Sequence, residues 1–390
     1  MNTILIDWNS YGNEYMKSLM AQRGYDVRLC PFSDKKSGSE MEEQKKVLSE
    51  MLDGAKAVDY VFSYNYFPEV SNVCNEKNVK YISWVYDSPY LNIYSYTVLN
   101  PVNSIFYFDY GVFKEFEASN IPTVHYLPLG VYEPALKKYI DSGTGKRNSD
   151  ISFVGSLYNE AKHSLYAKFA SIAPYAKGYL DAIISAQKNI YGENILEALL
   201  TPDIEAELQK AYPTDPNAPT VMTPKQLYSQ FVLSRQVTAL ERTEVLELLG
   251  KKGGLARNLY TPEKTAEIKG WSNKGPVDYY TSMYDVFASS KINLNITLRS
   301  IKTGISLRAF DIMGAGGFLL SNYQAEYSEY FDIGGEMAIY ESYEDLLGKV
   351  EYYLSHDKER EEIAAAGQRN VLENHTLSKR LDEMERVAGV

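Results

Sequence analysis

The stretch KINLNITLRSIKTGISLRAFDIMGAGGFLLSN, residues 291–322, holds residue types and spacings that could bind a nucleotide. It predicts a buried strand at Ile292–Thr297, a short loop, and a helix that starts at Gly304. A helix that starts after a glycine offers free backbone N–H groups and the positive end of its dipole to an anion. The nearby side chains that would add hydroxyl donors or positive charge are Arg299, Thr303, Ser306 and Arg308. The pattern therefore predicts a phosphate site at the start of this helix.

Asp311 lies seven residues past Gly304 and so on the same face of the predicted helix. At a rise of 1.5 Å per residue, it lies roughly 10 Å along the axis from the helix start. That separation suits a carboxylate that binds ribose hydroxyls while a diphosphate rests at the helix start, so the spacing fits a nucleoside diphosphate. A second interpretation stays open: Asp311 pairs with Arg308, and the glycines at 314–317 only end the helix before a buried strand.

The elements that must position this site alternate along the chain. Short apolar strands with helical stretches between them are typical of a parallel doubly wound sheet. The pattern breaks between Leu129 and Asp150, where mixed polar residues with Gly, Pro and Ser predict a domain boundary. The strands expected before this boundary are at 3–7, 27–32, 60–64, 80–85, 104–108 and 123–127.

A second run of the same kind follows, and its expected strands are at 150–155, 256–261, 291–297, 317–322 and 336–340. The roughly 80 residues at about 165–245 are too long for a simple strand-to-strand connection, so we expect a helical insertion there. The expected fold class is α/β, with two Rossmann-like doubly wound domains facing a cleft. The expected parts are a first domain at 1–135, a linker at 136–149, a second domain at 150–375 and a C-terminal helix at 376–390, which in a related fold would pack back on the first domain.

Composition limits the function classes. The 390 residues carry Lys+Arg 40 against Asp+Glu 51, a net charge of −11, which disfavours nonspecific nucleic-acid binding because that depends on basic side chains. Two cysteines are too few for a disulfide framework or a zinc site. No apolar run approaches the ~20 residues of a membrane span. We therefore expect a cytoplasmic protein with no transmembrane segment and no nucleic-acid partner.

Polar and aromatic residues follow several strands of the first run, at the carboxyl ends where ligands collect in open α/β sheets. Asp87 is the candidate general base at this edge, and Asp7 is the second candidate. An alternative stays open, because Asp87 before Ser-Pro is also typical of a turn residue that bonds its own backbone. The other residues expected to contact a substrate at this edge are Asn9, Tyr11, Gly12, Tyr66 and Tyr90.

The phrases INLNIT, TGISLRAFDIMGAGGFLLSN, EYFDIGGEM and YLSHDKEREEIAAAGQRNVLENHTLSKR resemble the C-terminal half of group 1 glycosyltransferases with the GT-B fold. They look closest to the CgeB-like spore-maturation group, and SWVYDSPY, HYLPLGVY and ALERTEVLELL have the same flavour. The resemblance covers 150–155 and about 259–380 well. It implies a C-terminal domain that binds a sugar nucleotide and an N-terminal domain that receives the acceptor.

Carried over by residue, the resemblance makes Asp311 the acid that holds the donor ribose. It makes Gly304, Ile305 and Ser306 the helix start that faces the diphosphate. It also makes Gly155 and Ser156 part of the loop after the first strand of the domain. Thr303 departs from the pattern, because many retaining members have a glutamate there.

Glycosyl transfer needs stabilised charge on the leaving diphosphate and a deprotonated acceptor hydroxyl. The resemblance implies that a helix dipole and basic side chains do the first job without a metal, and the chain has no Asp-x-Asp pair. We expect the 304–306 amides to act with Arg308 or Arg299, and Lys162 is a further candidate cation. We expect no cofactor or metal besides the nucleotide-sugar co-substrate.

These inferences favour a glycosyltransferase of the hexosyl type that uses a UDP- or TDP-sugar. The resemblance suggests a glycan or protein acceptor of the cell surface, spore or flagellum. Two alternatives stay open: a sugar-nucleotide epimerase or hydrolase of the same fold, and a non-catalytic nucleotide-sugar binding protein. A nicotinamide dehydrogenase is disfavoured because no G-x-G-x-x-G follows a predicted strand. The sequence leaves the oligomeric state open, a homodimer included.

Overall fold

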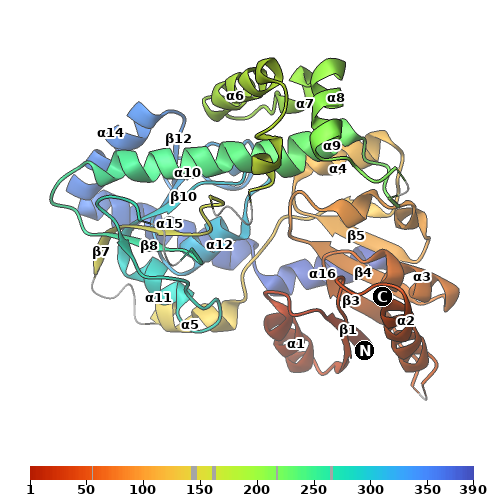
Figure 1. Ribbon diagram of the computed structural model, residues 1–390. Coiled ribbons are helices and arrows are strands. Elements are labelled where there is room, and N and C mark those ends of the chain that lie inside the picture. Colours follow the sequence, from red (N-terminus) through yellow and green to blue (C-terminus); the bar gives the residue numbers. More distant parts are fainter. Residues whose placement is uncertain (55, 142–146, 160–163, 217, 264–266) are drawn as a thin grey trace. The chain divides into compact units, whose positions relative to one another are not determined.

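The computed structural model describes residues 1–390 except 55, 142–146, 160–163, 217 and 264–266. The chain divides into two compact units (Figure 1). Unit 1 comprises Met1–Tyr132, Ala218–Val221 and His375–Val390, and unit 2 comprises Glu133–Asn217 and Met222–Asn374. Each unit is built on a sheet of six parallel strands, so the predicted α/β class with two doubly wound sheets is confirmed.

The sheet of unit 1 has the order β2-β1-β3-β4-β5-β6. Its inner strands are mostly apolar and are buried on both faces, as expected when helices cover both sides of a parallel sheet. The strands are β1 (Asn2–Asp7), β2 (Asp26–Pro31), β3 (Tyr60–Tyr64), β4 (Lys80–Val85), β5 (Asn103–Tyr107) and β6 (Val124–Tyr126). The helices are α1 (Asn13–Gln22), α2 (Ser39–Leu52), α3 (Pro68–Glu76), α4 (Tyr110–Ala118) and, from the end of the chain, α16 (Leu377–Ala388).

The sheet of unit 2 has the order β12-β11-β10-β7-β8-β9. Its strands are β7 (Ser149–Val154), β8 (Arg257–Tyr260), β9 (Ser272–Asn273), β10 (Ser290–Asn295), β11 (Leu319–Asn322) and β12 (Ala338–Tyr340). The helices around this sheet are α5 (Glu133–Asp141), α11 (Met283–Ala288), α12 (Leu307–Gly314), α13 (Tyr327–Tyr330), α14 (Tyr343–Ser355) and α15 (Asp357–Asn374).

A helical insertion lies between β7 and β8. Its helices are α6 (Pro174–Lys188), α7 (Leu196–Leu199), α8 (Pro202–Ala211), α9 (Pro224–Leu227) and the first part of α10 (Ser234–Gly250). The insertion has its own buried cluster, which includes Phe169 and Val237. Val245 and Leu249, further along α10, belong instead to the core of the sheet. The expected end of the insertion near 245 therefore falls inside a helix that serves both cores.

The stretch predicted to be a linker at 136–149 is partly helical. Residues 133–141 form α5, which belongs to unit 2. The Tyr139 hydroxyl donates a hydrogen bond of 2.8 Å to Asp285 on α11, and the Lys138 amine also bonds this carboxylate. The linker expected at 136–149 therefore overlaps the later part of this helix, and Pro134 lies in its first turn, where proline is tolerated.

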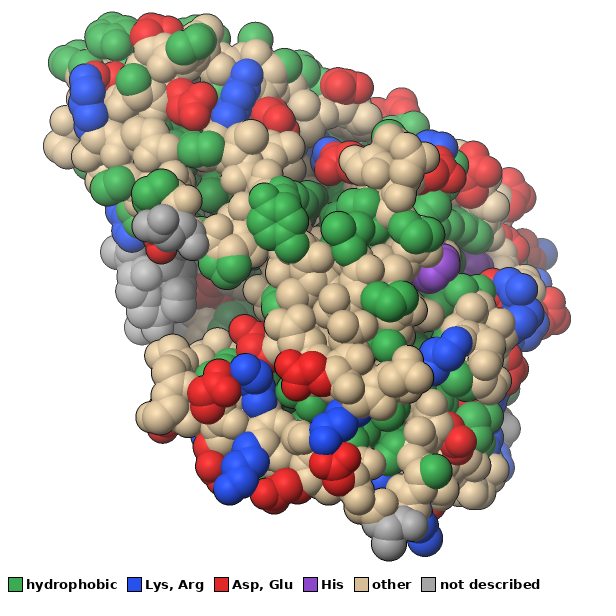
Figure 2. Space-filling model, turned by 90° about the vertical axis from the view of Figure 1, so that its right-hand side faces the viewer, with side chains coloured by type: hydrophobic (Ala, Val, Ile, Leu, Met, Phe, Trp, Pro, Cys, Tyr) green, Lys and Arg blue, Asp and Glu red, His purple; other side chains and the backbone are tan. Residues whose placement is uncertain are grey.

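Charged side chains of both signs are mixed over the face shown in Figure 2, where lysine and arginine lie among aspartate and glutamate. Alternating signs of this kind build no strong local field over that face. Among the described residues, no helix has the length and apolar character needed to cross a bilayer.

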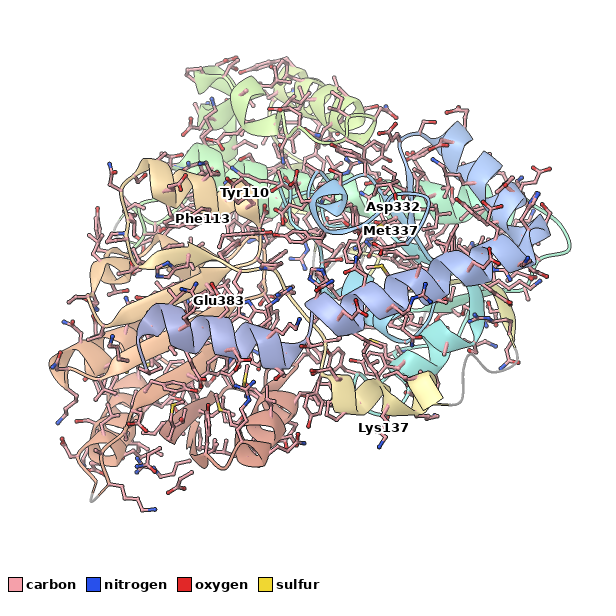
Figure 3. The ribbon with its side chains drawn as sticks, turned by 180° about the vertical axis from the view of Figure 1, so that it is seen from behind. Tyr110, Phe113, Lys137, Asp332, Met337 and Glu383 are labelled. Carbon is pink, nitrogen blue, oxygen red and sulfur yellow. The ribbon has the colours of Figure 1, made fainter. Side chains whose placement is uncertain are left out.

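The C-terminal helix α16 belongs to unit 1, where it packs against β4 and β5. Glu383 marks this helix in Figure 3. Its buried face includes Leu381 and Met384, and the Tyr60 hydroxyl of β3 donates a hydrogen bond of 2.8 Å to Glu385. These contacts make the last helix part of the first sheet's core.

Candidate functional site

The strand order of unit 2 creates a switch point beside β7. From β7 the chain continues to β8 and β9 on one side, and then returns to β10, β11 and β12 on the other. In open parallel sheets, ligands bind beyond the carboxyl ends of the strands at such a point. The loops that follow β7 and β10 contain most of the residues predicted to bind the donor.

The start of α12 differs from the prediction. The helix begins at Leu307 with Ser306 as its N-cap, so the predicted start at Gly304 was wrong. Ser306 has the extended backbone usual for an N-cap, and serine is a favoured residue there. Its hydroxyl oxygen is shielded from solvent and has no hydrogen-bond partner among the described residues. An unsatisfied hydroxyl beside free helix N–H groups is suited to an anionic ligand.

The later start also shortens the distance to Asp311. Five residues separate Asp311 from Ser306, or roughly 7.5 Å along the axis at 1.5 Å per residue. The carboxyl is buried, the Tyr284 hydroxyl donates to it at 3.2 Å, and Arg308 Nη1 lies 3.8 Å from its Oδ2. Burial raises the pKa of Asp311 to about 7, against the opposing effect of Arg308 and the Tyr284 and Tyr279 hydrogen bonds. The pairing with Arg308 that the sequence left open is present, and it leaves Asp311 poised to change charge near neutral pH.

Arg308 lies in the first turn of α12 and is about a quarter exposed, with a side-chain exposure of 28%. Its guanidinium faces the Phe287 ring at 5.4 Å and contacts the Met283 sulfur. Its ion pair with Asp311 is long. Arg308 therefore retains charge that can act on a ligand at the helix start.

The loop after β7 is held by a carboxylate that the sequence analysis missed. Glu263, after β8, accepts hydrogen bonds from the Ser156 hydroxyl and from the backbone N–H groups of Leu157 at 3.1 Å and Tyr158 at 3.3 Å. The Gly155 N–H bonds to Tyr260 at 2.9 Å. Burial favours a higher pKa for Glu263, but the hydrogen bonds from Ser156 and other donors outweigh it and lower the pKa. Gly155 and Ser156 lie in the loop after β7, and the Gly155 N–H and the Ser156 hydroxyl already bind protein.

All three guanidinium nitrogens of Arg299 bind protein. Its Nε lies 2.7 Å from Glu241, and its terminal nitrogens donate at 2.9 Å to the backbone oxygens of Ile190 and Lys188. Its guanidinium also lies 4.0 Å from the centroid of the Tyr191 ring. Arg299 ties the insertion to the loop after β10, so we do not retain it as a phosphate ligand. Lys162 falls outside the described residues.

Thr303 occupies the position where many retaining members of the resembled family have a glutamate. Its side chain contacts a glutamate from elsewhere in the chain, Glu326. Its hydroxyl donates a 2.7 Å hydrogen bond to Glu326, and the Glu326 N–H bonds to the Thr303 carbonyl at 3.2 Å. Glu326 is buried and follows β11. A carboxylate is therefore present beside Thr303, although it comes from another loop. Because Glu326 lies outside the helix that carries Asp311, no sequence spacing indicates that it belongs to this site.

In unit 1, the carboxyl ends of β3 and β4 bring Asn65 and Asp87 together. Asn65 has a left-handed backbone with φ 57°, and its amide nitrogen donates to Asp87 at 2.7 Å. The Asn65 side-chain oxygen accepts from the Tyr86 N–H at 3.1 Å. Asp87 is open to solvent on one side, yet surrounding protein atoms partly desolvate its carboxyl and raise its pKa. A raised pKa makes a carboxylate a stronger base.

Asp7 ends β1 and caps the turn that follows it. Its carboxylate accepts from the Asn13 amide at 3.1 Å and from the Asn9 N–H at 3.4 Å. Gly12 has φ 104°, and a Cβ there would lie 3.0 Å from the Tyr64 ring, so this turn requires glycine. Tyr11 projects from the same turn with an exposure of 64%. The turn presents an exposed ring beside a carboxylate that is already hydrogen-bonded.

The two other predicted acceptor residues differ in burial. Tyr66 is fully buried, and its hydroxyl donates to Thr97 at 2.8 Å, so we do not retain it as an acceptor contact. Tyr90 is partly exposed, and its hydroxyl donates to the Tyr66 carbonyl at 2.8 Å. Tyr90 can therefore offer a ring face, while its hydroxyl supports the loop.

Comparison with known proteins finds a family match in the later part of the chain. Residues 235–386 match the family described as Glycosyl transferase-like. The match runs from α10 through α12 and α15 and includes Ser306, Arg308 and Asp311. This segment is therefore similar to glycosyl transferase-like domains. No curated protein matches the chain by sequence.

Solved structures match nearly the whole chain at low identity. A glycosyltransferase from Rickettsia africae ESF-5 has a TM-score of 0.55 at 12% identity, with 99% of this chain and 98% of that chain covered. Anabaena Alr3699/HepE in complex with UDP-glucose has a TM-score of 0.56 at 7% identity, with 100% of both chains covered. AviGT4, a glycosyltransferase involved in avilamycin A biosynthesis, has a TM-score of 0.50 at 13% identity, with 100% and 99% covered. Together they establish the GT-B fold.

Proposed function

We propose that the chain is a metal-independent glycosyltransferase that moves a hexose from a UDP- or TDP-sugar to a glycan or protein acceptor. The observation that carries this proposal is the arrangement at the switch point of unit 2. There the start of α12, with the unpaired Ser306 hydroxyl and Arg308, lies one to two turns from the Asp311 carboxyl. This arrangement can hold a diphosphate at one end and ribose hydroxyls at the other.

The glycosyl transferase-like match over 235–386 supports the reaction class. The Anabaena protein was determined in complexes with UDP and with UDP-glucose, which supports a uridine nucleotide as the first donor to test. The lack of any Asp-x-Asp pair in the sequence supports leaving-group stabilisation by helix N–H groups and arginine.

Unit 1 supports a role in acceptor activation. The Asp87 carboxylate, with its raised pKa and its fixed contact to Asn65, suits a general base for an acceptor hydroxyl. Tyr11 and Tyr90 offer rings near the same edge of the sheet, as saccharide contacts do. An acceptor of the cell surface, spore or flagellum is the class suggested by the CgeB-like sequence resemblance.

The proposal is tested by thermal unfolding with a panel of UDP-, TDP-, GDP- and CMP-sugars in EDTA and in Mg²⁺. A ligand that binds only the folded state raises the melting temperature by mass action. We expect one nucleotide family to stabilise the protein equally with and without the metal, and to be hydrolysed slowly when no acceptor is present. Binding without any turnover would favour a nucleotide-sugar binding protein. No stabilisation by any donor would contradict the proposal.

A further inference from the structure

Four arginines surround the switch point of unit 2, and three of them are engaged by the protein. Arg242 is buried, and it donates to the backbone oxygens of Ile296, at 3.2 Å from Nε, and of Ser156. Arg299 is held by Glu241 and by two carbonyls of the insertion. Arg308 pairs weakly with Asp311. For the fourth, Arg235, the described part of the chain provides only an aromatic contact.

Arg235 lies in the first turn of α10, on the helix face that contacts the loops after β7 and β10. This face also carries Thr238 and Arg242, three and seven residues further along the helix. The Thr238 hydroxyl accepts the Arg299 N–H at 2.9 Å, so it touches the loop after β10. Arg242 reaches the ends of both β7 and β10. The helical spacing therefore aims Arg235 at the same edge of the sheet.

The Tyr158 ring holds the Arg235 guanidinium in place. The guanidinium carbon lies 4.6 Å from the ring centroid, and that of Arg242 lies 5.0 Å from it. A cation on an aromatic face is oriented but keeps its full charge and its N–H donors. Arg235 is half-buried. It is therefore a preoriented cation with donors to offer.

Glu263 fixes the backbone that carries this ring. Tyr158 has φ 58°, a left-handed conformation that is costly for a residue with a side chain. The Glu263 carboxylate compensates by accepting the N–H groups of Leu157 and Tyr158 together with the Ser156 hydroxyl. Through these bonds Glu263 fixes the conformation of the loop backbone. The loop in turn positions the Tyr158 ring, and the ring orients the Arg235 guanidinium.

We propose that Arg235 binds the diphosphate of the nucleotide sugar, with Tyr158 and Glu263 as its positioning residues. A guanidinium matches phosphate oxygens with two parallel N–H groups and stays charged as the leaving group gains charge. The cation would come from the insertion side of the domain, across the switch point from Ser306 and Arg308. This inference rests on the proposed function, because it assumes a nucleotide donor at the switch point.

The test compares nucleoside diphosphates with their nucleosides, by isothermal titration of the whole chain. UDP, TDP and GDP are each measured against uridine, thymidine and guanosine. The variants are Arg235→Ala, Arg235→Lys and, as a matched control, Arg369→Ala, which removes an exposed arginine of α15. We expect Arg235→Ala to weaken the affinity for the diphosphate by about tenfold or more and to leave the affinity for the nucleoside unchanged. Arg235→Lys should recover part of the loss, and Arg369→Ala should match the unaltered protein.

Each other result overturns a defined part of the account. If diphosphate and nucleoside weaken together, Arg235 has only a structural role. If the diphosphate binds Arg235→Ala as tightly as the unaltered protein, the assignment of Arg235 fails while the proposed function stands. If the unaltered protein binds none of the diphosphates, the proposed donor site fails and Arg235 fails with it.

Discussion

The two sheets share one architecture but offer different chemistry at their carboxyl edges. In unit 2, a helix start and arginines lie beside β7 and β10, together with the Ser306 hydroxyl, which has no partner among the residues that the structure describes. In unit 1, the edge beside β1, β3 and β4 is formed by tyrosines, asparagines and two hydrogen-bonded aspartates. The first edge suits an anion, and the second suits a neutral ligand with hydroxyl groups. Strand order decides where a ligand binds, while the loop residues decide which ligand it is.

The largest expected effect removes the proposed base of unit 1. Asp87→Asn keeps the contact with Asn65 but cannot take a proton, so the rate of transfer should fall by about 10² to 10⁴. The dissociation constant for the donor should not change, because the proposed donor site lies in unit 2. Glu43→Gln, which alters an exposed carboxylate of α2 in the same unit, is the control for transfer rates. Loss of donor binding in Asp87→Asn would contradict the assignment of the donor site to unit 2 and of the base to unit 1.

The next effect concerns stability. Arg299→Ala leaves the fully buried Glu241 without its charged partner, and breaking such a buried pair costs about 3–5 kcal/mol. Denaturant unfolding should show this loss, while the folded variant should bind UDP as before. A loss below about 1 kcal/mol would contradict the buried pairing, and weaker UDP binding by the folded variant would restore Arg299 as a candidate ligand.

Asp311→Asn should weaken the affinity for UDP by about 10- to 100-fold, because the ribose hydroxyl would lose a charged hydrogen-bond acceptor. The matching change on the other sheet, Asp7→Asn, should leave UDP binding unchanged. Titration calorimetry of both variants compares the two edges directly. Equal losses in the two variants would show that the donor contacts both units.

The same carboxyl predicts a pH dependence. Burial raises the pKa of Asp311 to about 7 from an ordinary value of 3.8, so the folded chain binds this proton more tightly than the unfolded chain. The resulting stabilisation is complete below about pH 4 and is lost as the pH rises through 7. Relative to Asp311→Asn, the protein should therefore lose up to roughly 4 kcal/mol of unfolding free energy over that range.

Donor binding should change in the opposite direction. The ionised carboxyl is the better acceptor for a ribose hydroxyl. The affinity for UDP-glucose, whose esterified diphosphate does not titrate in this range, should therefore rise between pH 6 and 8 in the unaltered protein and stay flat in Asp311→Asn. Calorimetry at several pH values measures both. A rise of equal size in the variant would assign the titration to another group.

The smallest effect concerns Tyr66. Tyr66→Phe removes a buried hydrogen bond to Thr97 and should cost about 1 kcal/mol of stability. Its acceptor KM should stay unchanged, whereas Tyr90→Ala, which removes a partly exposed ring of the same unit, should raise it. A raised KM in Tyr66→Phe would show that burial does not exclude Tyr66 from the acceptor site.

Much of the fold could be predicted because apolar runs bounded by polar turns mark buried strands. The ranges expected for β3 and β4 match the structure residue for residue. β9, with only Ser272 and Asn273, carries no such signal and was missed. The predicted helix start at Gly304 relied on glycine as a boundary signal. The N-cap serine two residues later marks the actual boundary.

The site was predicted less completely, for a physical reason. Spacing along the chain identified Ser306, Arg308 and Asp311, which share one helix and its cap. It could not show that the donors of Arg299 turn toward the insertion, because that depends on Glu241, 58 residues away. Arg235, Glu263 and Glu326 reach the strand ends through contacts between distant segments, so no local pattern indicates them.

Hydrogen exchange of the backbone with and without UDP reports on both sheet edges in one experiment. We expect slower exchange at 155–158 and 304–311 in unit 2 when UDP is bound, with unchanged exchange at 7–13 and 86–90 in unit 1. Protection confined to the unit 1 segments, or absent from 304–311, would contradict this expectation.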